Sequence, residues 1–245
     1  MAPASLDPMT LGGEVSEVRA LKLEATQRLL GDTIRISDAD WQEASLLPGW
    51  TRAHVATHLA RNADGLRLAF ETMMLGMPQR MYASEPDKER DIERGSERNG
   101  LALQIDLDVS SGLLNEALDA LETIDQAMPV ELRAGFRLPA RLLPLARLDE
   151  VVLHHVDLGV GFTVDDVAHE TARRLLEWSA FRLGDREDIP LLELRSSSGL
   201  VARLGSYGEV VVVEGDDRPL LGWLTGRGSG DGLEGTDDLV MPLWG

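Results

Sequence analysis

The chain has 245 residues, of which 42 are acidic and 24 basic, so its formal net charge is −18. This charge opposes non-specific binding to nucleic acids and to anionic membranes by electrostatic repulsion, and we expect neither as a partner. The absence of cysteine excludes disulfides, thiolate metal ligands and a nucleophilic cysteine, so any thiol chemistry must use a thiol from outside the chain.

The first 13 residues lack the basic start and apolar run of a secretory signal. No run of 18 apolar residues follows anywhere in the chain, so we expect no membrane-spanning helix. Together these features predict a cytoplasmic protein, and we expect it to act as a monomer.

Two helices are predicted in the first third of the chain. Apolar residues recur at steps of three and four from Val15 to Leu29 and stop before Gly31, which is typical of an amphipathic helix closed by glycine. Thr51 is a suitable N-cap for a second helix that runs to about Leu75.

Two more helices are predicted before residue 160. Leucines on one face indicate a helix from about Leu101 to Met128, ended by Pro129. Pro144 suits the first turn of a fourth helix, which continues to Gly159. Four helices within this length favour a helical bundle.

After Gly159 the pattern becomes mixed. The expected elements are a helix at about 164–183, short strands at 191–194 and 209–213, and a last helix that begins near Asp216 or Asp217 and ends before Gly226. The fold class we predict is mainly α plus α+β, with a four-helix bundle at residues 1–162 and a smaller α+β domain at 163–245.

Two helical pairs carry the chemistry. His54 and His58 are four residues apart on the second helix, and Glu150 and His154 are four apart on the fourth, so each pair projects from one helical face. Inward carboxylates and imidazoles of facing helices build metal sites in bundles, and three such ligands with an open position suit zinc. The alternative is a set of half-buried histidines bonded to carbonyl groups.

The remaining histidines suit other places. His54 follows the expected cap closely, and His155 points about 100° away from His154 around the helix. We expect both to support packing around the site, and we expect His169 at the surface.

Four segments of the chain, taken in order, match the pattern of one known family. They are Gly49–Val55 continued at 58–63, Met81–Ser84 followed by Asp91–Ile92, Glu150–His154 followed by Val156–Gly159, and Gly222–Ser229. These segments resemble the mycothiol-dependent maleylpyruvate isomerases of the DinB-like metalloenzyme superfamily, and the first of them resembles the second-helix signature of that family. The matching segments lie in both expected domains, and the resemblance implies a DinB-like four-helix bundle.

The resemblance also implies a metal and a thiol cosubstrate. It makes His58, Glu150 and His154 the ligands of zinc or another divalent ion, and it makes mycothiol the thiol. A thiolate activated in this way adds to the cis double bond of maleylpyruvate, the bond rotates, and expulsion of the thiolate leaves fumarylpyruvate.

Three further residues are candidates for the site. The resemblance implies that Arg227 binds a carboxylate of the dicarboxylate substrate; the alternative is an arginine favoured at a helix end. Lys88 stands near the place where the family pattern predicts an arginine, and the alternative is a solvated charge cluster. Asn62 lies one turn beyond His58 and would orient a ligand or the thiol, unless it is simply a hydrogen-bonded helix residue.

Two other functions remain open at this stage. The same scaffold supports a mycothiol-dependent S-transferase, in which the thiolate stays attached to an electrophile. A non-catalytic helical module that binds metal or dimerises is the third possibility. We expect the isomerase, with Arg227 and Lys88 stabilising the enolate.

Overall fold

The computed structural model describes residues 6–184, 186–236, 239 and 241–243, and it divides into two compact units. One unit spans Val15–Gly161. The other begins at Phe162 and also includes the described segment before Val15, where Leu6 packs against the apolar core of that unit. In the described residues no helix is long and apolar enough to cross a bilayer.

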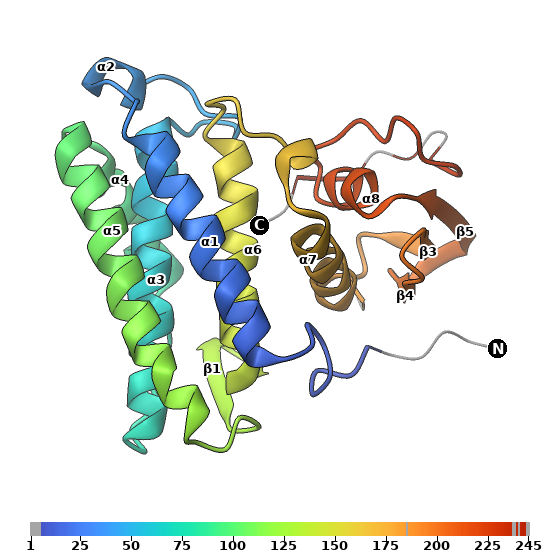
Figure 1. Ribbon diagram of the computed structural model, residues 1–245, viewed down its shortest axis with the longest axis horizontal. Coiled ribbons are helices and arrows are strands. Elements are labelled where there is room, and N and C mark those ends of the chain that lie inside the picture. The colour runs from blue at the N-terminus through green and yellow to red at the C-terminus, as the bar shows by residue number, and fades with distance from the viewer. Residues whose placement is uncertain (1–5, 185, 237–238, 240, 244–245) are drawn as a thin grey trace. The chain divides into compact units, whose positions relative to one another are not determined.

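Four long helices form the first unit (Figure 1). They are α1 (Val15–Thr33), α3 (Arg52–Met74), α5 (Gly100–Ala117) and α6 (Leu143–Asp157). Helix α3 contacts both α5 and α6, and α1 also contacts both. The predicted four-helix bundle is therefore confirmed.

Helix α3 begins and ends as its sequence predicts. The Oγ1 atom of Thr51 accepts a hydrogen bond from the backbone N–H of His54, and the His54 ring accepts one from the N–H of Thr51, which satisfies two exposed donors of the first turn. The helix stops before Gly76, whose φ is +70°. Between these ends Val55 and Leu59 are fully buried, each contributing about 2 kcal/mol by leaving water.

The third predicted helix is too long. Helix α5 ends at Ala117, and a 3₁₀ turn (Leu118–Glu122) continues from it. The buried Leu118 and Leu121 belong to that turn, so the leucine pattern runs past the α-helix. The chain then forms an antiparallel hairpin of β1 (Pro129–Arg133) and β2 (Phe136–Pro139), and a 3₁₀ turn (Ala140–Leu142) leads into α6.

Two helices of the first unit were not predicted. They are the short α2 (Asp38–Trp41) and α4 (Glu85–Ser96). Ser84 caps α4 by accepting a hydrogen bond from the N–H of Asp87. The helix has few apolar residues, so it shows no apolar periodicity, but it packs closely on α3: a Cβ at Gly95 would lie 2.3 Å from Cγ2 of Thr57.

The second unit is the predicted small α+β part. It contains α7 (His169–Arg182), β3 (Pro190–Ser196), β4 (Val201–Leu204), β5 (Tyr207–Gly215) and α8 (Asp217–Leu224). The strand order is β4-β3-β5, with β3 antiparallel to β4 and parallel to β5. Helices α7 and α8 contact one another.

The predicted helix at 164–183 is divided in two. A 3₁₀ turn (Val164–Asp166) comes first, and α7 begins only at His169. Val167 between them has extended backbone angles, with ψ at 131°, so the helix cannot continue through it. Strand β4 was also missed, because four residues offer little pattern.

Candidate metal site

The three predicted ligands lie together inside the first unit. His58 comes from α3, and Glu150 and His154 come from α6. Atom Oε2 of Glu150 lies 3.0 Å from Nε2 of His58 and 3.4 Å from Nε2 of His154. One ligand atom from each residue lies within 4.8 Å of the other two. The four-residue spacing on α6 thus places Glu150 and His154 on the face that meets His58.

Asp157 orients one of these imidazoles. Its Oδ2 atom lies 2.8 Å from Nδ1 of His154, and its side chain is 1% exposed. A carboxylate on the far nitrogen of a histidine fixes the ring and makes the near nitrogen a better ligand. This role of Asp157 was missed, although its place three residues after His154 on one helix was a usable signal.

Burial and pairing set the charges in this cluster. Burial lowers the pKa of His58 to about 4, although the hydrogen bond with Glu150 opposes the shift. Burial alone would raise the pKa of Glu150, but hydrogen bonds with His154 and His58 hold it well below its ordinary value. At neutral pH His58 is therefore neutral and Glu150 anionic, as metal ligands must be.

The pKa of His154 moves in the other direction. Burial alone would lower it, but the hydrogen bonds with Asp157 and Glu150 raise it above the ordinary value.

The donor set of two imidazoles and one carboxylate is that of catalytic zinc sites with three protein ligands and an open position. The residues present therefore fit a divalent ion of this kind.

The ring of Trp50 packs against His58, the candidate ligand on α3. The ring of Trp50 lies 5.5 Å from that of His58, and Nδ1 of His58 is buried with no hydrogen-bond partner in the described part of the chain. Packing on Trp50 therefore holds the His58 ring. His54, one turn earlier, bonds instead to Glu93 and Ser96 of α4, at 3.1 Å and 3.2 Å from its Nε2.

His155 faces away from the cluster. Its Nε2 atom lies 3.1 Å from Oδ2 of Asp32, at the end of α1.

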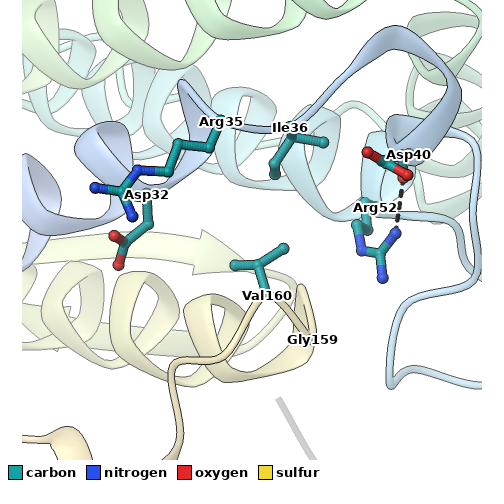
Figure 2. Close-up of a pocket in the computed structure, with 7 residues that line it drawn as sticks. All are labelled: Asp32, Arg35, Ile36, Asp40, Arg52, Gly159 and Val160. Atoms are coloured by element: carbon teal, nitrogen blue, oxygen red, sulfur yellow. Dashed lines mark hydrogen bonds between the residues drawn. The ribbon is translucent and has the colours of Figure 1, made fainter.

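Asp32 lines a pocket of about 300 Å³ (Figure 2). Figure 2 shows Arg35 and Arg52 on opposite sides of this pocket, and Arg52 is already bonded to the carbonyl oxygens of Asp40 and Leu158. Backbone carbonyl groups thus hold Arg52 at the wall of this pocket.

Asn62 lies in a buried polar network. Its Oδ1 atom accepts a hydrogen bond of 2.8 Å from Nη1 of Arg147, which also donates to the carbonyl oxygen of Leu59. Burial lowers the pKa of Arg147 to about 10, and Glu150 opposes the shift. The carbonyl oxygen of Asn62 thus accepts an internal hydrogen bond. The alternative interpretation of this residue, a hydrogen-bonded helix residue, describes such a contact. Sequence reasoning missed Arg147, because arginines are rarely buried.

Lys88 lies close to the cluster. It is on α4, and its Nζ atom lies 5.6 Å from the ring centroid of Tyr82. Its charge is one of the factors that lower the pKa of His58, after burial and His154. The side chain of Lys88 is 16% exposed, and its nearest carboxylate, Glu85, is 3.9 Å away. The side chain of Lys88 is therefore largely shielded from solvent.

Arg227 belongs to the second unit, directly after α8. Its N–H donates to the carbonyl oxygen of Gly222, at 2.7 Å, and its Nη1 donates to that of Thr225, at 3.0 Å. It lines a pocket of about 230 Å³ together with Arg218 and Ser229. The guanidinium is thus fixed at a pocket wall within its own unit.

Comparison with known proteins identifies the family of the chain. Residues 23–159, which include all three candidate ligands, match the mycothiol maleylpyruvate isomerase N-terminal domain. Two crystal structures, of a mycothiol-dependent maleylpyruvate isomerase and of its histidine-to-alanine mutant, each superpose with a TM-score of 0.83 and 26% identity, covering 94% of this chain and 97% of theirs. No curated protein matches the sequence significantly. The chain belongs to the family of the mycothiol maleylpyruvate isomerase N-terminal domain.

Proposed function

We propose that this protein is a metal-dependent enzyme that uses mycothiol to isomerise maleylpyruvate to fumarylpyruvate. The observation that carries the proposal is the cluster of His58, Glu150 and His154 in a chain of this family. The absence of cysteine supports it further, because the reaction then needs an external thiol.

These three side chains would hold the ion, and zinc suits them best. A divalent ion held there lowers the pKa of a thiol brought to it, so that a thiolate is present near neutral pH. Two neighbouring side chains would keep the histidine ligands in place. Asp157 holds the ring of His154, and Trp50 packs against that of His58.

The reaction is balanced without any other reactant. The mycothiol sulfur forms a bond to one carbon of the cis double bond, and the electron pair moves to the conjugated carbonyl oxygen as an enolate. The former double bond can now rotate. Return of the electron pair re-forms the alkene in the trans configuration, breaks the carbon–sulfur bond and releases the thiolate.

Positive side chains hold the substrate during this sequence. We assign Lys88 to the enolate or to one carboxylate, because it lies near His58 and has little solvent exposure. We assign Arg227 to the other carboxylate, because its guanidinium can bind one bidentately. Asn62 would orient the thiol through its amide N–H groups, since its carbonyl oxygen is bonded to Arg147.

The test uses the zinc-loaded protein with mycothiol and maleylpyruvate. We expect loss of the cis isomer, formation of fumarylpyruvate and full recovery of the thiol, with no reaction when mycothiol is omitted. A stable mycothiol conjugate in place of fumarylpyruvate would instead identify an S-transferase. Absence of any thiol-dependent reaction would show that the proposal is wrong.

A further inference from the structure

Tyr82 lies on a segment that two other elements hold in place. The N–H of the preceding residue, Met81, donates to the carbonyl oxygen of Leu132 on β1 at 3.2 Å. On the other side the segment approaches α3 at Gly65, where an added Cβ would lie 3.0 Å from Met81. The backbone beside Tyr82 is therefore fixed between α3 and β1.

The hydroxyl oxygen of Tyr82 is buried without a hydrogen-bond partner in the described part of the chain. Buried polar atoms are nearly always paired, and an unpaired one reduces stability. A buried phenol without a partner is therefore a group whose partner is expected from outside the chain.

The surroundings of Tyr82 connect it to the metal site. The Nζ atom of Lys88 lies over its ring, and Glu150 is close enough to influence its ionisation. Burial, reinforced by the charge of Glu150, raises the pKa of Tyr82, so the phenol keeps its proton and acts as a donor. A neutral donor beside a lysine suits an oxygen that acquires negative charge.

We propose that Tyr82 is a catalytic residue whose hydroxyl donates a hydrogen bond to the carbonyl oxygen that becomes the enolate. The inference rests on the proposed function and adds a residue to it. No bond to Tyr82 forms: its proton stays on the phenol oxygen while the electron pair moves onto the substrate oxygen and back. Lys88 supplies positive charge on the same side.

The chain contains only two tyrosines, and this provides a matched control. Tyr82→Phe removes the hydroxyl and keeps the ring, while Tyr207→Phe makes the same change at an exposed position of β5. With zinc, mycothiol and maleylpyruvate, we expect Tyr82→Phe to lower kcat about 100-fold. The KM for mycothiol and the zinc content should stay as in the parent, and the Tm should stay the same or rise, because the removed hydroxyl has no partner in the free protein. Tyr207→Phe should change none of these quantities.

The outcomes separate this inference from the proposed function. An active parent with a kcat for Tyr82→Phe within twofold of it would overturn the role of Tyr82 and leave the isomerase intact. An inactive parent would overturn both. A purely structural role predicts instead a lower Tm or zinc content with an unchanged kcat per zinc-loaded molecule.

A second measurement keeps the hydroxyl of Tyr82 and adds only one fluorine to its ring. In Tyr207→Phe protein grown with 3-fluorotyrosine, Tyr82 carries the only fluorine. We expect its ¹⁹F resonance to shift when the zinc-loaded protein is saturated with fumarylpyruvate. An unmoved resonance at concentrations that inhibit turnover would contradict contact between this phenol and the substrate.

Discussion

At the scale of single residues, the orientation of His154 depends on one buried carboxylate. Asp157 contacts Nδ1 of His154, so Asp157→Asn keeps the shape of the side chain and weakens this interaction. We expect zinc affinity to fall about 10-fold to 100-fold, measured by competition with a chelator. Asp32→Asn is the control, because Asp32 contacts His155; equal losses in both variants would contradict the role of Asp157.

Helical spacing predicted which side chains share a face, and the i,i+4 rule places Glu150 and His154 together on one helix. The choice of His58 over His54 as the third ligand came from the family resemblance, because these two histidines are also four residues apart. The neighbours were harder to foresee. Arginines are usually exposed, so the residue type of Arg147 gives no sign that it is buried. The burial of the Tyr82 hydroxyl depends on how a connecting segment packs against α3, and the spacing of apolar residues does not predict such packing.

At the scale of elements, close contact between α3 and α4 positions Lys88. A Cβ at Gly95 would lie 2.3 Å from the buried Thr57, so we expect Gly95→Ala to reduce the free energy of unfolding by about 1–3 kcal/mol. Gly112→Ala on the exposed face of α5 meets no atom within 4 Å and should increase it by about 0.5–1 kcal/mol. Denaturant unfolding compares the two; similar effects would contradict the tight contact.

A buried lysine makes the bundle sensitive to pH. Burial, with Arg147 and Arg19 nearby, lowers the pKa of Lys22 to about 8. Between this value and the unfolded pKa of 10.5 the unfolded chain binds more protons, so the contribution of Lys22 to stability should rise with pH across that window. Urea unfolding from pH 7 to 10.5 should show this rise, and it should be absent in Lys22→Met. A parallel pH dependence in both proteins would exclude Lys22 as its source.

The fold class followed from periodicity, whereas several elements did not. Helix α4 was missed because its exposed charges leave only Ile92 and Ser96 buried, and no apolar stripe remains to be recognised. The helix ending at Ala117 was extended because the 3₁₀ turn after it buries leucines too. Burial patterns thus predict which residues face the core more reliably than they predict where a helix ends.

At the scale of the whole molecule, each unit supplies a separate part of the proposed chemistry. The bundle holds the candidate metal ligands, and the second unit carries Arg227. We expect Arg227→Ala to raise the KM for maleylpyruvate at least 10-fold with unchanged zinc content. Arg227→Lys should recover only part of the loss, because an ammonium cannot bind a carboxylate as a fork. An unchanged KM in Arg227→Ala would contradict this role.

The central claim is that two imidazoles and one carboxylate hold a catalytic ion. Elemental analysis of the purified parent, His58→Ala and His54→Ala tests it most directly, because the two histidines lie one turn apart on α3 and only His58 contacts Glu150. We expect about one zinc per chain in the parent and in His54→Ala, and almost none in His58→Ala. Full zinc content in His58→Ala would contradict the account.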